Sequence, residues 1–429
     1  MTMEIAFFGR DWWNHAHDVA AALRERGAVH PAIVPWGERE IPVWVIARYN
    51  EAREALNDPR LSKDGAGLIK IMNKHLTVDG KEPELSAMFT ARHMIFLDPP
   101  DHTRLRRVLA KHFTRARIDQ LKPRIEQMIS ELVDELPLGR PVDLISGLAF
   151  PLPLYVICEL IGVPERKRGL LRAWTYALME DLPDKAEAAS RNMQTYLIEL
   201  INSAHANPGD DLLSALVQET AEDRLSMEEL LGTLFLLFVA GHETTTALIG
   251  NSIACLLADN GHLWHEVGQR PELLPHAVRE FSRYDSAVAT ATHRYTKEPV
   301  TIGGTTIDAG EIVLVSLLSA NRDERQFGRA DQINIHREEP NLAFGYGIHY
   351  CLGVHLGVLE TEIALGALTR RFPAARMAVD KAELVRRQPA MIPNSFVDLL
   401  VNLGSRAAVD DAREVMATPG SCPQDRHPW

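Results

Sequence analysis

The residues best suited to chemistry lie in a ten-residue stretch, residues 344–353, which sets one cysteine among glycines and aromatic residues. Gly345 and Gly347 can adopt backbone conformations closed to other residues, so main-chain N–H groups can approach the Cys351 sulfur and stabilise it as a thiolate. Gly353 leaves space in which a flat ligand could lie against the first turn of the helix that follows. A buried structural cysteine in a glycine-rich turn is the alternative interpretation.

A second candidate is the segment 240–245, with the sequence A-G-H-E-T-T, inside a long apolar helical pattern. The hydroxyl of Thr244 can bond back to the carbonyl of Ala240, which would open the helix and leave a groove. Glu243 stands beside it, and an acid next to an alcohol could pass protons to a bound ligand. A kinked helix with a solvated glutamate is the alternative.

Other polar residues are weaker candidates when each is taken alone. Glu280 and Arg283 stand three apart on an expected helix, and such pairs are usually exposed and contribute a few tenths of a kcal/mol. The possible anion binders are His102, Arg106, Arg294 and His349, each of which is by itself more typical of an ordinary surface or core residue.

Two motifs are excluded by spacing. His242-Glu243 begins like the zinc motif H-E-x-x-H, but Thr246 occupies the place of the second histidine. The glycines of the cysteine loop begin like G-x-G-x-x-G, but Tyr350 occupies the place of the third glycine, so no phosphate-binding loop is expected.

The composition of the chain limits the classes of protein to which it could belong. The chain has 429 residues, of which 46% are hydrophobic and 24% charged, as in soluble globular proteins. Its formal net charge of -12 disfavours nucleic acid as the main partner. The N-terminus lacks the pattern of a signal peptide, and the apolar run 230–240 is too short to span a bilayer, so we expect no membrane anchor.

The four cysteines, Cys158, Cys255, Cys351 and Cys422, lie far apart without a C-x-x-C pair. This spacing indicates neither a disulfide framework nor a zinc ribbon. A reducing compartment, the cytoplasm, is the expected location.

Periodicity predicts a mainly α protein with small β-sheets. We expect one domain over residues 1–404 and a disordered polar tail over 405–429. Residues 65–95 show no period and are expected to form a long loop with short helical pieces. Helices are expected over 11–26, 49–57, 123–136, 152–161, 166–179, 186–206, 211–219, 226–260 and 271–284, after Pro100, and from Cys351 to about residue 372; strands are expected over 41–46, 300–302, 305–307 and 312–316.

Taken together, these motifs resemble the cytochrome P450 superfamily, in its soluble bacterial branch of the actinomycete, class I type. The cysteine loop matches F-G-x-G-x-H-x-C-x-G at every fixed position. The other matches follow in the family's order: Asp98-Pro99-Pro100-Asp101-His102-x3-Arg106, Ala240-Gly241-x-Glu243-Thr244-Thr245, Glu280-x-x-Arg283, Ala320-Asn321-Arg322-Asp323 and Arg337. The resemblance covers about residues 15 to 403. Ala287 and Glu324 depart from it, since many relatives have proline at both places.

The resemblance implies a triangular prism with haem b between a central distal helix and the helix after the cysteine loop. Cys351 would be the thiolate ligand of the iron, with Phe344 packed against it, and the loop glycines would tune it. Glu243 and Thr244 would deliver protons to bound O2, for which Ala240 and Gly241 make room. The propionates would be held by His102, Arg106, Arg294 and His349, and a buried ion network would consist of Glu280, Arg283 and Arg337.

The resemblance also implies a roomy apolar substrate pocket. We expect hydroxylation or epoxidation of a bulky natural product, in secondary-metabolite biosynthesis. The alternatives are coupling or desaturation by the same kind of enzyme, a haem-binding sensor, or a cysteine hydrolase. The expected lining residues are Leu237, Ala240, Thr244, Val288, Ala289, Thr290, Ala291, Ile392, Pro393 and Asn394.

A redox partner is the last implication. The chain carries no flavin or iron–sulfur module, so we expect electrons from a ferredoxin served by an NAD(P)H-dependent ferredoxin reductase. Candidates for the basic docking patch are Arg106, Arg107, Lys111 and His355. We expect a monomer that binds neither nucleic acid nor membrane.

Overall fold

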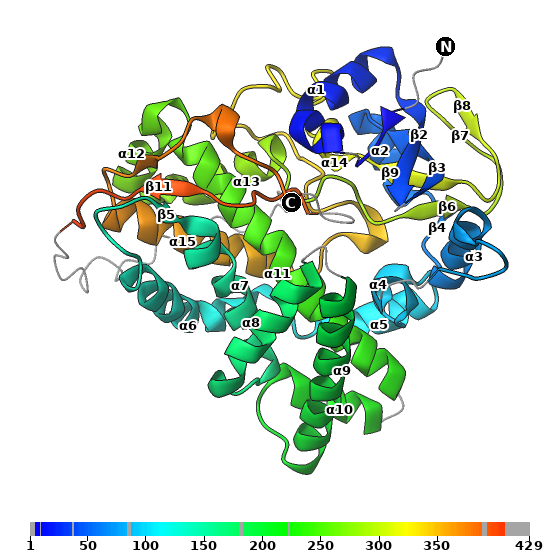
Figure 1. Cartoon of the computed structure of the whole chain (residues 1–429), viewed down its shortest axis with the longest axis horizontal. Coiled ribbons are helices and arrows are strands. Elements are labelled where there is room, and N and C mark those ends of the chain that lie inside the picture. The colour runs from blue at the N-terminus through cyan, green and yellow to red at the C-terminus, as the bar shows by residue number, and fades with distance from the viewer. Residues whose placement is uncertain are drawn as a thin grey trace.

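One long helix, α11 (Met227–Leu257), runs through the middle of the protein, and the other helices pack around it (Figure 1). It begins with the expected capping box: Ser226 Oγ accepts from the Glu229 N–H at 3.1 Å, and the Glu229 carboxylate accepts from the Ser226 N–H at 3.0 Å. Buried residues occur all round the helix, because neighbours cover every side of it. This computed structural model describes residues 5–8, 10–36, 38–83, 87–179, 183–221, 224–387 and 393–407.

The helices that surround α11 fill most of the molecule. The helix after the cysteine loop, α15 (Val354–Arg371), packs against it, as do α7 (Pro151–Ile161) and α13 (Leu274–Tyr284). The remaining helices are α1 (Arg10–Arg26), α2 (Tyr49–Asn57), α3 (Gly65–Leu76), α4 (Ala87–Thr90), α5 (Asp101–Ala110), α6 (Arg115–Asp134), α8 (Glu165–Met179), α9 (Pro183–Ala206), α10 (Leu212–Ala221), α12 (His262–Gln269) and α14 (Leu317–Ala320), with a π-helical turn η2 (Ile145–Ala149) before α7.

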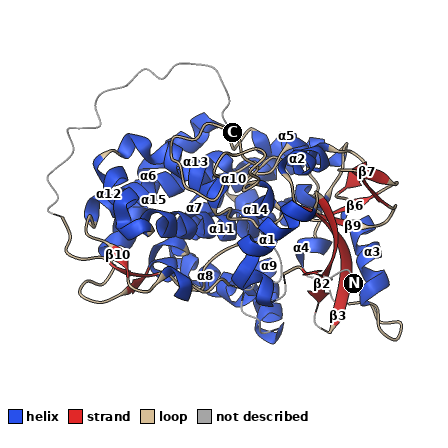
Figure 2. Cartoon of the chain, turned by 90° about the horizontal axis from the view of Figure 1, so that it is seen from above, coloured by secondary structure: helices blue, strands red, loops and turns tan. Residues whose placement is uncertain are grey.

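Three small sheets complete the fold. The largest has the strand order β1-β2-β3-β9-β6-β4, in which β1 pairs parallel to β2 and β3 parallel to β9, while the other pairs are antiparallel. It lies at one end of the molecule, away from the main body of helices (Figure 2). The strands are β1 (Ile5–Ala6), β2 (Val29–Trp36), β3 (Arg39–Ile46), β4 (Leu61–Ser62), β5 (Val142–Asp143), β6 (Arg294–Thr296), β7 (Val300–Ile302), β8 (Thr305–Ile307), β9 (Ile312–Val315), β10 (Arg376–Met377) and β11 (Leu400–Asn402).

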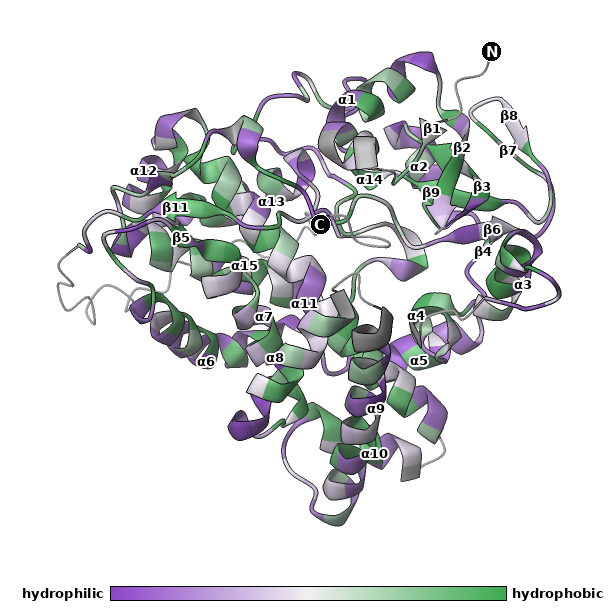
Figure 3. Ribbon diagram, viewed as in Figure 1, coloured by the Kyte–Doolittle hydropathy of each residue, from purple (hydrophilic) through white to green (hydrophobic). Residues whose placement is uncertain are grey.

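Apolar side chains gather into one core around α11 and two smaller ones beside the large sheet. Outer helices such as α6 carry both polar and apolar residues, whereas β3 and β9 are largely apolar (Figure 3). The outline in Figure 1 is roughly triangular, with the sheet at one corner and α9 and α10 at another. The prediction of a mainly α protein with small sheets is therefore confirmed.

The expected helices and strands are largely present, and three of the differences have a clear physical reason. Residues 65–76 form α3 and not a loop, because Asp64 caps the helix by accepting from the Gly67 N–H at 2.8 Å and Leu68 and Met72 are buried. The helix expected from residue 123 begins at Arg115 and runs through Pro123.

Strand β2 is the longest of the strands that the sequence pattern does not predict. It holds Pro31 and Pro35, which discourage a strand prediction because proline cannot donate to a ladder. It nonetheless pairs along its whole length with β3. Most of the tail for which disorder was predicted, residues 408–429, lies outside the described residues.

Helix α11 also bears on the question of membrane spans. It is the one helix of the described part that is long and apolar enough to cross a bilayer by length and composition. Of its most apolar window, 67% is buried inside the protein, which is the placement of a core helix. The apolar run 230–240 is only one part of this helix, so its length alone does not exclude a membrane span.

Candidate active site

Cys351 differs from the other cysteines of the described part. Cys158 and Cys255 are buried, and burial raises the pKa of the Cys158 thiol to about 12, which makes that thiol unreactive. Cys351 is exposed. The surrounding protein raises the pKa of its thiol, while the Gly353 N–H and the positive charge of Arg106 act to lower it. A main-chain donor of the expected kind is therefore present, and it comes from Gly353.

The glycines of the loop have the backbone angles that the sequence suggested. Gly345 and Gly347 lie in the left-handed region, with φ of 78° and 74°. A side chain at residue 347 would also meet Asn57 Oδ1 at 2.9 Å and the Leu56 carbonyl at 3.1 Å, so only glycine fits between this loop and α2. At Gly353, by contrast, a Cβ would meet no atom within 4 Å. Open space therefore lies beside the first turn of α15, as expected.

The four expected anion binders come from separate parts of the chain, and the structure brings them together. The rings of His102, on α5, and His349, in the cysteine loop, lie 4.1 Å apart between centroids. His102 is buried, and neither of its ring nitrogens has a hydrogen-bond partner among the described residues. Burial and the charge of Arg106 lower the pKa of His102 to about 4.

The two arginines of this group are held by backbone carbonyls. Arg106 donates to the Tyr350 carbonyl at 2.6 Å, and Arg294 donates to the Thr292 carbonyl at 3.0 Å. Arg294 is buried, and burial lowers the pKa of its guanidinium to about 10. These cations lie in a low-dielectric environment that disfavours their charge unless an anion joins them.

Lys63 is a further member that sequence reasoning missed. It follows β4, is buried, and donates from Nζ to the Thr292 hydroxyl. Burial, together with the charge of Arg294, lowers the pKa of the Lys63 amine well below its usual value. Asp98 fixes the backbone at this point by accepting from the Lys63 N–H at 2.9 Å. A lone lysine in a polar stretch gives no signal in the sequence, because only the fold carries it to Arg294.

On α11 the acid and the alcohol stand as the sequence indicated. Thr244 Oγ1 donates to the Ala240 carbonyl at 2.6 Å. The helix is nevertheless continuous through this point, so the expected opening is not seen as a break in α11. Burial raises the pKa of Glu243 to about 7, and one oxygen of its carboxyl has no hydrogen-bond partner in the described part of the chain. Glu243 is therefore not a solvated glutamate but a poised acid, that is, a carboxyl group that can both hold and release a proton near neutral pH.

The small residues near this pair determine how closely the helices approach. A Cβ on Gly241 would lie 2.8 Å from Ile157 Cδ1 on α7, so glycine allows α7 and α11 to touch. A Cβ on Gly357, on α15, would lie 3.3 Å from Thr245 Oγ1 on α11. The helix with the acid–alcohol pair thus packs directly against the helix that follows Cys351.

Glu280, Arg283 and Arg337 form a buried network behind this region. Arg283 donates to both carboxylate oxygens of Glu280, at 2.7 and 2.8 Å, and Arg337 Nε donates to one of them at 3.3 Å. All three residues are buried. For this pair the ordinary expectation of an exposed ion pair is therefore wrong.

The expected pocket residues occupy different environments. Val288, Ala291 and Pro393 are partly exposed, as are Ala240 and Thr244 on α11. Others are buried, among them Leu237, Ala289, Thr290 and Asn394.

Ala289 packs inside the core beside the large sheet, and the Asn394 amide donates to Asp285 Oδ1 at 2.9 Å and to the Ser286 carbonyl at 3.0 Å. Asn394 therefore belongs to a polar network around Asp285 and not to an apolar wall. Ile392 lies outside the described residues.

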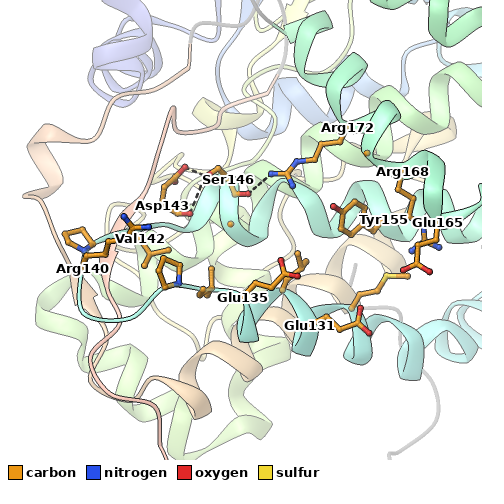
Figure 4. A pocket seen from close by; sticks show the side chains of 17 residues that line it. Glu131, Glu135, Arg140, Val142, Asp143, Ser146, Tyr155, Glu165, Arg168 and Arg172 are labelled. Carbon is orange, nitrogen blue, oxygen red and sulfur yellow. Dashed lines mark hydrogen bonds between the residues drawn. The ribbon is translucent and has the colours of Figure 1, made fainter.

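A separate cavity of about 580 Å³ lies elsewhere, between α6, η2 and α8 (Figure 4). Charged residues of both signs line it, including Glu131, Glu135, Arg140 and Arg168, and Arg172 donates across it to the Ser146 carbonyl at 3.1 Å. None of the expected catalytic or haem-binding residues takes part in its lining.

The residues around Cys351 fit a haem group. Four features agree: an exposed sulfur, open space beside Gly353, a histidine whose two nitrogens lack partners, and a cluster of buried cations that needs anions. Haem offers an iron for the sulfur, a flat ring for the space and two carboxylates for the cations. The residues that could hold the carboxylates are Lys63, His102, Arg106, Arg294 and His349.

Comparison with known proteins gives consistent matches. The family model described as Cytochrome P450 matches residues 170–395. Cytochrome P450 107B1 of Saccharopolyspora erythraea is 45% identical over 80% of this chain and 85% of its own length. The vitamin D(3) 25-hydroxylase of Pseudonocardia autotrophica is 40% identical over 94% of this chain and 97% of its own. The solved structure of the tirandamycin C-bound P450 monooxygenase TamI superposes with a TM-score of 0.86, at 40% identity, over 93% of this chain and 100% of that one.

Proposed function

The chain belongs to the cytochrome P450 family, and from this premise we infer that it hydroxylates or epoxidises a bulky, apolar small molecule in the biosynthesis of a natural product. It is a monooxygenase that uses haem b and O2. The observation that carries the finer proposal is the poised acid Glu243 next to Thr244, on the helix that packs against α15.

Haem would be held by Cys351 through the iron and by the cationic cluster through its carboxylates. When bound, it supplies the centre at which O2 is activated, and a thiolate ligand favours cleavage of the O–O bond. The carboxylates would restore the charge balance of Lys63, Arg294 and Arg106, whose charged forms burial now disfavours.

The residues of α11 supply protons in this proposal. With a pKa of about 7, Glu243 holds a proton in about half of the molecules at neutral pH and can release it. The Thr244 hydroxyl donates to the Ala240 carbonyl, which leaves its oxygen lone pairs free to accept a proton from the Glu243 side. Ala240, which is partly exposed, adds little side-chain bulk at the place where O2 would lie, whereas the missing side chain of Gly241 allows the contact with Ile157 of α7 and does not make room for O2 as expected.

Apolar side chains support the proposed substrate class. Val288 and Ala291 are partly exposed and apolar, and Val288 forms a β-bridge with Pro393, so two distant segments share one wall. The relatives named for vitamin D(3) and tirandamycin C point to the same class of ligand. The alternatives of a non-enzymatic haem sensor and a cysteine hydrolase do not agree with a family of monooxygenases.

Electron supply by a ferredoxin is part of the proposal. Of the four residues considered for docking, Lys111 pairs with Glu219 at 3.1 Å, and Arg106 is held by Tyr350. Arg107, on α5, is exposed, which makes it the main candidate. We also propose that residues 1–404 act as one domain, in a monomer located in the cytoplasm.

The test has two steps. A panel of macrolides, terpenoids, other polyketides and cyclic peptides is first titrated into the haem-loaded protein, and shifts of the haem spectrum identify binders. A binder is then turned over with ferredoxin, its reductase and NAD(P)H under ¹⁸O2. The proposal expects a product that contains one labelled oxygen atom. A product formed without label would contradict it and would instead support coupling or desaturation.

A further inference from the structure

A histidine with no part in holding haem lies next to the catalytic acid. His242, on α11, is completely buried, and its Nε2 lies 3.0 Å from the carbonyl oxygen of Phe150, where η2 meets α7. A carbonyl oxygen can only accept, so this bond requires a hydrogen on Nε2. In a neutral imidazole the other nitrogen, Nδ1, is then an acceptor without a hydrogen. The Phe150 ring, edge-on at 4.3 Å between centroids, fixes the plane of the imidazole.

The Nδ1 atom of His242 faces Glu243. It lies 3.5 Å from Glu243 Oε1, and within the described residues neither atom has a hydrogen-bond partner. Two acceptors this close repel each other when the carboxylate is ionised. When the carboxyl carries a proton, its O–H can donate to Nδ1, and both buried atoms are satisfied.

The protonation equilibria agree with this geometry. Burial raises the pKa of Glu243 to about 7 and lowers the pKa of His242 to about 4. The charged groups that act on the pair are Arg387, on both residues, and Arg172 of α8, on His242. Both arginines disfavour an imidazolium. A neutral histidine beside a protonated carboxyl is thus favoured over an ion pair of imidazolium and carboxylate.

We propose that His242 is a positioning residue whose neutral Nδ1 accepts a hydrogen bond from the protonated carboxyl of Glu243 and so holds the proton that this acid delivers. This inference rests on the proposed role of Glu243. In the transfer, the O–H bond of the carboxyl breaks and its proton passes toward the Thr244 side of α11. The carboxylate then takes a proton from water, and the hydrogen bond to His242 forms again. No electrons move in either step.

Two substitutions distinguish the roles of the two ring nitrogens of His242. In His242→Gln the amide nitrogen can still donate to the Phe150 carbonyl, but no acceptor stands where Nδ1 was. In His242→Asn the amide oxygen replaces Nδ1 as the acceptor, and the bond to Phe150 is lost. The acid is titrated in the haem-loaded protein, without substrate or turnover, by the infrared band of its protonated carboxyl, which Glu243→Gln identifies by removing it.

The expected result is a midpoint near pH 7 in the natural protein. In His242→Gln the pKa should fall by about one unit, a tenfold increase in the acid dissociation constant, whereas His242→Asn should stay near the natural value. An unchanged pKa in His242→Gln would overturn the proposal, and so would a rise, which an ion pair predicts. An equal fall in both variants would indicate a general loss of packing and would overturn it too.

A second measurement needs no altered side chain in the pair. Nitrogen NMR of ¹⁵N-histidine-labelled protein, as the diamagnetic ferrous carbon monoxide complex, reports the protonation of each ring nitrogen. We expect His242 to be neutral, with hydrogen on Nε2 and a hydrogen-bonded Nδ1; an imidazolium signal at pH 7 would overturn the proposal. Neither readout depends on oxygenation, so failure of the proposed function in the ¹⁸O2 experiment remains distinguishable from failure here.

Discussion

Replacing Glu280 by alanine should lower the free energy of unfolding by about 3–5 kcal/mol, the usual cost of removing one partner of a buried ion pair. The carboxylate accepts two bonds from Arg283, one from the Asn334 N–H at 2.8 Å and one from Arg337. Only 1% of the Arg283 side chain and 6% of the Arg337 side chain are exposed, so water cannot replace the lost acceptor.

The size of the loss follows from what Arg283 retains. It still donates to the carbonyls of Asn321, Ala330 and Gln332 at 2.9, 2.8 and 3.1 Å, so its other N–H groups stay satisfied. It loses its counter-charge, and two hydrogen bonds to a charged group are worth about 1.5–3 kcal/mol each. Against a total stability of about 5–15 kcal/mol, such a loss is large.

The assay is urea unfolding of the haem-loaded protein, followed by tryptophan fluorescence. Glu272→Ala is the matched control, because Glu272 pairs with Arg270 at 3.3 Å while both side chains are more than half exposed. That control should change stability by about 0.5 kcal/mol at most. Arg337→Met should cost less than Glu280→Ala, since Glu280 keeps Arg283. A Glu280→Ala protein as stable as the control would refute the reasoning.

Two further predictions concern the haem site, and a third concerns the docking of ferredoxin. Gly347→Ala should destabilise the protein by about 1–3 kcal/mol in thermal unfolding, because the new Cβ would press against Asn57 and Leu56. Gly80→Ala is the control: Gly80 has a similar φ of 76°, but a Cβ there would meet no atom within 4 Å, so the loss should be smaller. Equal losses in the two variants would contradict the role of the close contact. Lys63→Met should speed the transfer of haem to apomyoglobin about tenfold, because the haem would lose one charge-assisted hydrogen bond to the buried lysine. Lys297→Met is the control and should leave the transfer rate unchanged, since the Lys297 side chain is half exposed. Equal transfer rates in the two variants would show that Lys63 does not hold haem. Arg107→Glu should slow reduction by ferredoxin and make the rate depend less on salt, because an exposed positive charge on the docking surface is reversed. Arg26→Glu, at an exposed residue of α1, is the control and should leave the rate unchanged. A rate of reduction that does not depend on salt in the unaltered protein would contradict charge-guided docking.

The conformations of the cysteine loop and of the Thr244 segment could be predicted from the sequence, because they depend on residues that are close in the chain. Left-handed glycines, a capping box and a threonine that bonds back along its helix each depend on neighbours a few residues away. The same holds for α11, whose apolar pattern indicates a central helix. Such features need no knowledge of the rest of the fold.

What could not be predicted depends on contacts between distant segments. Lys63 becomes a member of the cationic cluster only because β4 pairs with β6, which carries Arg294. The partner of His242 is a carbonyl at residue 150, which no motif marks. Asn394 was expected in the pocket wall, yet its amide is taken by Asp285. Where the fold supplies the partner, residue type alone does not reveal it.

The claim on which the whole account depends is that Cys351 binds haem iron as a thiolate. The most direct measurement is the absorption spectrum of the reduced, carbon monoxide-bound protein. Thiolate ligation by Cys351 should give the red-shifted Soret band of such complexes, and Cys351→Ser should lose it. A Soret band of the histidine-ligated type, in protein whose folding circular dichroism has verified, would contradict the account.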